Sequence, residues 1–508
     1  MTRRFGLLLA IASIVGLAAC GGGGGGSNSS SVTSVSVSCS PTTVTSGGTS
    51  QCSATVSGTG NFSTAVTWSA SAGSISSSGL LTAPVVSTSL VDTVTATSVQ
   101  NTNVQGTASV TVNPTSAQGN VAPIVVDAGP EPQVFLSTNI AFTTVTVCVP
   151  GTTTCQTIDH IMVDTGSSGL RLISGVLQIS LPQENDSNGN ALDECLVFLD
   201  GYIWGPVATA DITMSGENAG SVPVQLIIPS SGSPAVPNSC SSQNPSGGAG
   251  NEGGSNDSDA VQTFGANGII GVGLFQQDCG LGCTNLGNNN PPPVYYDCAS
   301  SGCNPTFASL QQQLPNPVTG FATDNNGVLI QMDSVGNGGA ATANGSLIFG
   351  IGTESNNALG SATVYPVPDS GNNAGNMLTT FNSQQYQAFV DSGSNGLFFL
   401  DSNTTGIATC TGFMGASSWY CPSNSPDNLS ASNQGQSTSG PVGNPVQVGF
   451  TIESASSLFN TDNTAFSTLG GPLSDTFDWG LPFFYGRNIF TAVENMTTPG
   501  GAGPYYAF

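Results

Sequence analysis

Two short segments of the chain share one pattern, and this repetition constrains the fold more than any other feature. Residues 161–170 read Ile-Met-Val-Asp-Thr-Gly-Ser-Ser-Gly-Leu, and residues 388–397 read Ala-Phe-Val-Asp-Ser-Gly-Ser-Asn-Gly-Leu. Each is an apolar strand that ends in an aspartate, Asp164 or Asp391, and continues into a hydroxyl residue, a glycine and a serine. We expect the two aspartates to meet at one site.

The residues after each aspartate are suited to hold a carboxylate. The first hydroxyl can brace the opposite turn, the glycine lets the backbone bend and present N–H groups, and the serine can bond the outer carboxylate oxygen. These supporting residues are Thr165, Gly166, Ser167, Ser392, Gly393 and Ser394. Two carboxyls held a hydrogen bond apart share one proton, because both do not ionise easily. Such a pair acts as general base and general acid on an amide. The alternative is a pair of ordinary Asp-Gly turns, which two matched copies make less favoured.

Charge excludes several function classes. The chain holds four basic residues, all Arg, against 29 acidic residues, for a net charge of −25. Binding of nucleic acid through a basic face is excluded, as is electrostatic attachment to anionic lipid. The acidity favours solubility, and an alternative is tolerance of acid, since few salt bridges exist to be lost. The 67 glycines and many small polar residues favour all-β architecture with many turns.

The first 31 residues are expected to be a targeting segment and a tether. Residues 1–19 combine two arginines with an apolar stretch, as in a signal peptide. Leu17-Ala18-Ala19-Cys20 resembles the bacterial lipobox, which implies cleavage before Cys20, lipid on its sulfur and, with Gly21 next, the outer membrane. An ordinary secretory signal with a chance Cys is the alternative. Residues 20–31 are a flexible Gly/Ser tether.

Twelve further cysteines predict disulfides in an oxidising compartment. Pairing of sequence neighbours is the expectation, although the sequence leaves the connectivity open. The expected pairs are Cys39/Cys52, Cys148/Cys155, Cys195/Cys240, Cys279/Cys283, Cys298/Cys303 and Cys410/Cys421. The alternative is a zinc site with four sulfur ligands from the fourth and fifth pairs.

Residues 32–113 are predicted to be a separate domain, because several segments alternate apolar and small polar residues with a period of two. This domain resembles bacterial immunoglobulin-like domains in Val66-Thr67-Trp68-Ser69, in the segment 79–84 and in the final strand 108–112. The resemblance implies a sandwich with Trp68 in its core. We expect a spacer, with binding of a glycan or protein ligand as the alternative. Residues 114–129 are expected to be a linker with a strand-like segment at 121–126 inside it.

Residues from about 130 to 508 resemble the two-lobed pepsin-like aspartic peptidases. Beyond the Asp turns, the resemblance rests on Ile269-Ile270-Gly271, which matches the family's apolar-apolar-Gly strand, and on strand-like segments 346–350 and 488–493. In the second half, the matching strand is expected at 480–482 or 484–486. The resemblance implies an all-β chain, an immunoglobulin-like sandwich followed by a bilobal pepsin-like double-ψ β unit, with lobes at 130–330 and 331–508. It also implies a peptide or protein substrate, no cofactor and no metal.

The chain departs from that family at two places. Arg171 stands seven residues after the first aspartate, where the family usually has Trp. Near the dyad it would lower the carboxyl pKa values, and a surface or structural ion pair is the alternative. The family's flap Tyr falls near Leu199, so Tyr202 and Trp204 are the nearest flap or cleft candidates.

The leading hypothesis is a lipid-anchored aspartic endopeptidase that faces the periplasm or the cell surface. The whole pattern also resembles uncharacterised proteobacterial lipoproteins. The main alternative is a catalytically inactive pepsin-like binding or structural lipoprotein, and another is an adhesin led by residues 32–113. A Ser/His/Asp hydrolase would need His160, which is too far from Asp164 along one strand. A glycosidase also uses two carboxyls but would not explain the repeated turns.

Overall fold

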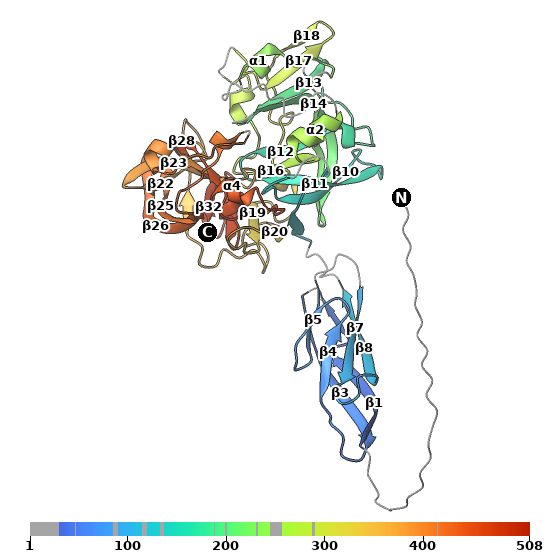
Figure 1. Cartoon of the computed structure of the whole chain (residues 1–508). Helices are drawn as coiled ribbons and strands as arrows, with labels where there is room; N and C mark the ends of the chain where they lie inside the picture. The colour runs from blue at the N-terminus through green and yellow to red at the C-terminus, as the bar shows by residue number, and fades with distance from the viewer. Residues whose placement is uncertain are drawn as a thin grey trace, which may run out of the picture. The chain divides into compact units, whose positions relative to one another are not determined.

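The computed structural model describes residues 30–45, 47–84, 90–113, 119–132, 137–186, 188–198, 201–229, 232–243, 257–286, 290–413 and 415–508. The predicted signal peptide, Cys20 and nearly all of the tether lie outside the described residues. The chain divides into two compact units, Met1–Ser116 and Ala117–Phe508. Strands dominate the described part of both units, which confirms the all-β prediction (Figure 1).

The first unit is a sandwich of two four-stranded sheets. One sheet has the order β1 (Ser31–Ser40), β3 (Thr49–Thr59), β6 (Leu80–Thr82), β5 (Ser74–Ile75). The other has the order β2 (Thr43–Thr45), β8 (Gln105–Asn113), β7 (Leu90–Ser98), β4 (Val66–Ala70). Leu81, Val94 and Val110 pack in the core between the sheets, with Trp68 partly buried against them. Alternating burial along the strands follows from the period-two pattern.

The larger sheet of the second unit runs through both halves of the sequence and has fifteen strands. Its order begins β18 (Gly302–Pro305), β17 (Tyr295–Ala299), β13 (Ala191–Val197), β14 (Tyr202–Met214), β15 (Glu217–Ile227), β12 (Ser168–Ile173), β16 (Gly268–Val272) and β11 (Cys155–Asp164). It continues β10 (Phe142–Cys148), β9 (Val121–Val126), β20 (Ala343–Phe349), β19 (Gly327–Met332), β29 (Asn488–Ala492), β32 (Tyr505–Ala507) and β21 (Val364–Pro366).

The second sheet of this unit has seven strands and builds the second lobe. Its order is β26 (Gly440–Ile452), β25 (Asp427–Ser437), β22 (Met377–Phe381), β23 (Gln384–Val390), β28 (Leu473–Trp479), β24 (Leu397–Leu400), β27 (Gly470–Gly471). A small pair, β30 (Thr497–Thr498) and β31 (Gly501–Ala502), lies near the C-terminus. One large hydrophobic core contains residues of both lobes.

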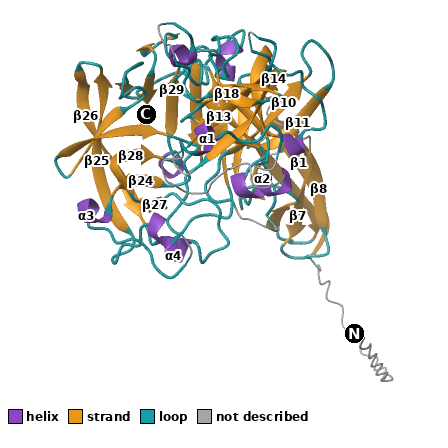
Figure 2. Ribbon diagram, turned by 90° about the horizontal axis from the view of Figure 1, so that it is seen from above, coloured by secondary structure: helices purple, strands orange, loops and turns teal. Residues whose placement is uncertain are grey.

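The helices are short and lie between strands (Figure 2). The α-helices are α1 (Asn238–Ser241), α2 (Asp257–Phe264), α3 (Ser402–Thr405) and α4 (Ala455–Leu458). The 3-10 helices are η1 (Ser174–Val176), η2 (Gly280–Cys283), η3 (Pro317–Gly320), η4 (Ala416–Ser418) and η5 (Leu481–Phe483). Within the described ranges, no helix has the length and apolarity needed to cross a membrane.

Two predicted boundaries are wrong. Strand β9 lies in the expected linker 114–129, yet it pairs with both β10 and β20 and buries Ile124 and Val126. The predicted lobe boundary at 330/331 cuts β19, which pairs with β20 and β29. Both errors have one cause. The strands that join the lobes are short apolar segments between turns, and one partner of each, β20 for β9 and β29 for β19, lies more than a hundred residues away.

The two lobes repeat one local arrangement. In the first lobe, β11 runs parallel to β16 while β12 runs antiparallel to it, so Leu170 lies opposite Ile270. In the second lobe, β23 runs parallel to β28 while β24 runs antiparallel to it, so Leu397 lies opposite Trp479. This repetition confirms the two-lobed pepsin-like class.

The strand predicted to pair with the second Asp strand was misplaced. The structure assigns this role to β28, whose last residue Trp479 precedes Gly480. Residues 480–482 instead lead into the 3-10 helix η5, and residues 484–486 follow that helix. The misplacement arose because Asp478 interrupts the apolar run that the sequence pattern requires.

All six predicted disulfides are present. Three of them, Cys39–Cys52, Cys148–Cys155 and Cys298–Cys303, join residues directly opposite each other on antiparallel strands. The four cysteines of the alternative zinc site form Cys279–Cys283 and Cys298–Cys303, so their sulfurs are not available as thiolate ligands.

The sixth disulfide, Cys410–Cys421, closes a loop of the second lobe, and here the prediction was incomplete. It gave Cys421 no partner besides Cys410, whereas the structure places the Cys421 Sγ 3.2 Å from Ser454 Oγ and 3.1 Å from Ser456 Oγ. A disulfide sulfur has no proton, so the two serine hydroxyls are the donors and the sulfur is a weak acceptor. Cys421 thus also ties the loop to the start of α4, more than 30 residues away, which sequence spacing does not indicate.

Candidate active site

The two repeated segments bring Asp164 and Asp391 together. Asp164 is the last residue of β11 and Asp391 follows β23 directly. The turns that follow them are in direct contact, since Thr165 N–H donates to Ser392 Oγ at 3.1 Å and a Cβ on Gly166 would reach the Asp391 carboxyl. The two aspartates, far apart in the sequence, therefore form one site, as the repeated pattern predicts.

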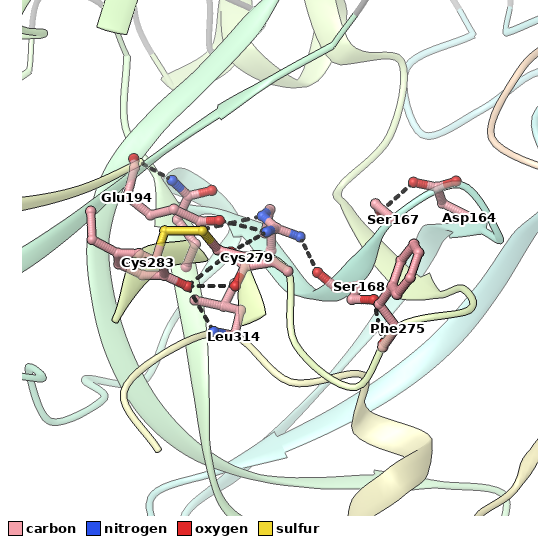
Figure 3. Close-up of polar contacts among 12 residues, drawn as sticks. Asp164, Ser167, Ser168, Glu194, Phe275, Cys279, Cys283 and Leu314 are labelled. Carbon is pink, nitrogen blue, oxygen red and sulfur yellow. Dashed lines mark hydrogen bonds and ion pairs between the residues drawn. A yellow bond between two sulfur atoms is a disulfide. The ribbon is translucent and has the colours of Figure 1, made fainter. Parts of the chain in front are cut away.

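Each carboxylate is held by its own turn. Gly166 N–H donates to Asp164 Oδ1 at 2.7 Å, and Gly393 N–H donates to Asp391 Oδ1 at 2.8 Å. The second oxygen of each aspartate accepts from the serine three residues later. Ser394 Oγ donates to Asp391 Oδ2 at 2.8 Å, and Ser167 Oγ donates to Asp164 Oδ2 (Figure 3). In both lobes, Oδ1 of the aspartate therefore accepts from a glycine N–H and Oδ2 accepts from a serine hydroxyl.

The hydroxyls of Thr165 and Ser392 lock the two turns together. Thr165 Oγ1 donates to Val390 O at 3.1 Å and accepts from Ser392 N–H at 3.0 Å. Ser392 Oγ donates to Val163 O at 2.7 Å and accepts from Thr165 N–H at 3.1 Å. These four reciprocal bonds are buried, so they fix the separation of the carboxyls. The bracing role predicted for these two residues is the one that they have.

Glycine is required at this site because each turn approaches the opposite carboxyl. A Cβ on Gly166 would lie 2.8 Å from Asp391 Cγ, and a Cβ on Gly393 would lie 2.7 Å from Asp164 Oδ1. Both distances are shorter than a side chain tolerates. Only glycine lets the two carboxyls pack against each other's turns.

The pKa of the Asp164 carboxyl is raised well above its usual value. Burial is the largest cause, followed by the charge of Asp391 and the hydrogen bond to it, while Ser167 and the Gly166 N–H oppose the rise. Asp164 is 4% exposed, whereas Gly166 beside it is exposed. The pair therefore retains a proton where isolated carboxyls would have lost it, and the edge of one turn faces solvent.

Arg171 does not act on the dyad, contrary to one expectation. Its side chain is fully buried and donates to Glu194 Oε1 and Oε2 at 2.5 and 3.2 Å. It also donates to Ser168 O at 2.7 Å and pairs with Asp278 Oδ2 at 3.3 Å. Tyr295 Oη donates to Asp278, and Leu314 N–H donates to Tyr295 Oη at 2.8 Å. Figure 3 shows this cluster, with Glu194 and Leu314 labelled, beside Asp164 and Ser167.

This cluster neutralises Arg171 locally. Burial and then the Glu194 charge raise the pKa of the Asp278 carboxyl well above its usual value. One cation thus bonds two buried carboxyl groups, those of Glu194 and Asp278. Arg171 is a structural residue that ties β12, the strand after the first Asp turn, to β13, as the ion-pair alternative held.

Trp204 is not a cleft residue. It has no exposed surface, its Nε1–H donates to Pro234 O at 3.0 Å, and its ring packs edge-on against Tyr296. The prediction used only the distance of Trp204 from the flap position along the sequence. It could not show that the Cys195–Cys240 disulfide packs against Trp204. Tyr202 is the first residue of β14, lies opposite Val197 on β13 and keeps part of its surface exposed. Next to it, Phe198 N–H donates to Gly201 O at 2.8 Å. Leu199 lies outside the described residues. Tyr202 remains the candidate flap residue.

His160 has partners other than a nucleophile. Its Nε2 lies 3.4 Å from Asp127 Oδ1 and its Nδ1 lies 3.2 Å from Asp159 Oδ2. The hydrogen bond to Asp127 raises the pKa of His160 and lowers that of Asp127. This pair ties the end of β9 to β11 and offers nothing to a Ser/His/Asp hydrolase.

The sequence analysis missed Asp478, a third carboxyl at the site. It is 2% exposed, and burial followed by the Asp391 charge raises its pKa well above its usual value. A visible signal was available, because Asp478 precedes Gly480 by two residues, as Ile269 precedes Gly271. In the described ranges, no group of three His, Cys, Asp or Glu side chains has metal-binding geometry.

These observations define the class: a two-lobed, pepsin-like β protein with two aspartate turns facing each other. The chain belongs to the family described as "Protein of unknown function (DUF3443)", which matches residues 116–508. Among solved structures, it is similar to the crystal structure of aspartic proteinase from Irpex lacteus. The sequence identity is 14%, the match covers 76% of this chain and 96% of that chain, and the TM-score is 0.42. We infer no chemistry from this likeness. No curated protein matches the chain.

Proposed function

We propose that the protein is an aspartic endopeptidase in which Asp164 and Asp391 activate water to hydrolyse peptide bonds. One observation supports this most directly: four buried reciprocal bonds lock the two aspartate turns together, and each carboxyl is held by a backbone N–H and a serine. A protein that needed only two strand-end turns would not require a buried Asp164 carboxyl of raised pKa packed against the turn of Asp391.

The pair supplies both halves of an acid–base reaction. Its ionised carboxyl takes a proton from water while the water oxygen bonds to the carbonyl carbon of a peptide or protein substrate. The protonated carboxyl gives its proton to the carbonyl oxygen, so a diol forms and the pair still holds one proton. The diol then returns a proton to the pair as the C–N bond breaks and the amine nitrogen is protonated. Products leave as acid and amine, with the pair in its starting state.

Three further proposals rest on the sequence. Cys20 carries lipid and anchors the chain to the cell envelope, with the outer membrane favoured because Gly21 follows it. The first unit acts as an immunoglobulin-like spacer, which its two-sheet sandwich supports, with a glycan or protein ligand as the alternative. Tyr202 contributes to a flap.

The test is cleavage of a peptide library from about pH 3 to 7, the range that a shared-proton pair spans, with products identified by mass spectrometry. The wild type is compared with Asp164→Asn and Asp391→Asn. Asp159→Asn is a matched control, because Asp159 lies on the same strand as Asp164 with its side chain 70% exposed. Cleavage by wild type and control alone supports the proposal. If folded wild-type protein leaves every peptide intact, the alternative of an inactive binding or structural lipoprotein is favoured.

A further inference from the structure

Asp478 stands on the same face of its sheet as the dyad. Strand β28 runs parallel to β23 with Asp478 in register with Phe389, two residues before Asp391. Alternate residues of a strand share a face, so the side chains of Asp478, Phe389 and Asp391 point the same way. Asp478 is almost fully buried, and its Oδ1 has no hydrogen-bond partner among the described protein atoms.

The first lobe shows that folding does not require a carboxyl here. Ile269 holds the matching place, since it is in register with Met162, two residues before Asp164. Burying a carboxyl where an apolar side chain serves is unfavourable unless an interaction compensates for the lost hydration. The interaction must therefore come from the neighbours of Asp478.

Those neighbours are acids and hydroxyls. After burial, the charge of Asp391 raises the pKa of Asp478 most, and the charge of Asp164 raises it further. The Ser394 hydroxyl lowers this pKa. Tyr506 on β32 is a buried phenol whose pKa is raised first by burial and then by the charges of the same three carboxyls. No cation is among the described groups that shift these pKa values. Acidic groups packed together without a neighbouring cation repel one another when they are ionised. Such a group of carboxyls and a phenol therefore keeps part of its protons.

The Ser394 hydroxyl determines where one of these protons must be. It has a single proton, and it donates that proton to Asp391 Oδ2 at 2.8 Å. Leu481 N–H donates to Ser394 O at 2.8 Å, which holds Ser394 beside the end of β28. A hydrogen bond between the Ser394 hydroxyl and Asp478 therefore needs Asp478 as the donor.

We propose that Asp478 is a positioning residue of the dyad: it is protonated and donates to Ser394 Oγ, which keeps Ser394 donating to Asp391. The three residues form a directed relay from Asp478 to Ser394 to Asp391, present in the second lobe only. The catalytic consequence rests on the proposed peptidase function, whereas the protonation of Asp478 does not.

Infrared difference spectroscopy at pH 7 tests the protonation without any substrate, because most carboxyls are ionised there. The wild type minus Asp478→Asn should show one lost carboxylic-acid band. The matched control is Asp475→Asn on the same strand, where the exposed side chain should give a lost carboxylate band instead. Ser394→Ala should shift the Asp478 band to the frequency of a free acid. A carboxylate band lost in Asp478→Asn, or an unshifted acid band in Ser394→Ala, overturns the proposal.

Turnover then tests the positioning role. Asp478→Ile, the first lobe's residue, should lower kcat about tenfold with KM unchanged, and Asp478→Asn, which keeps a donor for Ser394, should recover most of that loss. Equal kcat in folded Asp478→Ile and wild type refutes positioning. If the wild type has no turnover, the peptidase proposal fails, while the infrared bands still decide the state of Asp478 and its bond to Ser394.

Discussion

Replacement of Arg171 by Met should strongly destabilise the second unit. The guanidinium has no exposed surface and makes its bonds to Glu194, Asp278 and the Ser168 carbonyl. Met fills similar volume but leaves the Glu194 carboxylate buried without its cation and the carbonyl without a donor. Stranding one partner of a buried pair costs about 3–5 kcal/mol, and we expect that loss in the free energy of unfolding. Urea unfolding at neutral pH, followed by circular dichroism, measures it.

Two comparisons separate a stranded charge from simple loss of packing. Arg487→Met is the matched control, because Arg487 donates only to the carbonyls of Phe483 and Gly449 and has no carboxylate partner within the described ranges. Its loss should be near 1 kcal/mol, the value of an ordinary hydrogen bond. Adding Glu194→Gln to Arg171→Met should recover at least about 1 kcal/mol, because no buried charge then remains. Equal losses for the two arginine variants, or no recovery in the double variant, would refute the reasoning.

Three other changes have defined outcomes. Thr165→Val removes two buried bonds between the Asp turns and should cost about 2 kcal/mol in urea unfolding, with lower turnover. His160→Gln should cost about 0.5–1 kcal/mol near pH 5.5 and little near pH 8.5. The raised pKa of His160 gives stability that is lost as the pH rises through that pKa. The lowered pKa of Asp127 gives stability that is lost as the pH falls through that pKa. The pair therefore stabilises the fold at pH values between the two pKa values. Joint replacement of Cys195 and Cys240 by Ser opens a link across 45 residues and should cost at most about 4 kcal/mol. A stability loss from His160→Gln that is independent of pH would contradict the ion-pair account.

The sequence predicted the parts of the site that lie within a few residues of each aspartate. Asp164 and Ser167 belong to one turn, so their contact follows from spacing alone. The bracing by Thr165 was also predictable, because the second turn repeats the first. Disulfides such as Cys148–Cys155 followed because the partners lie seven residues apart.

The sequence did not predict contacts between distant segments. Arg171 and Asp278 are 107 residues apart, and no periodicity marks them as partners. The same holds for Cys421, whose bond to Cys410 was predictable but whose contacts with the serines near α4 were not. The strand-like segment that forms β9 was predicted but was placed in a linker, because its partner β20 lies in the other half of the chain. Asp478 was overlooked because a search for apolar residues before glycine passes over a buried acid.

The decisive experiment for the proposed peptidase is the pH dependence of kcat/KM for a cleaved peptide, from about pH 3 to 7. We predict a bell-shaped profile for the wild type, whose two limbs belong to the carboxyl pair. Asp164→Asn and Asp391→Asn should each abolish turnover, while Asp159→Asn should keep the wild-type profile. Turnover that survives either dyad substitution would contradict the account, because a single carboxyl cannot act as both base and acid in one step.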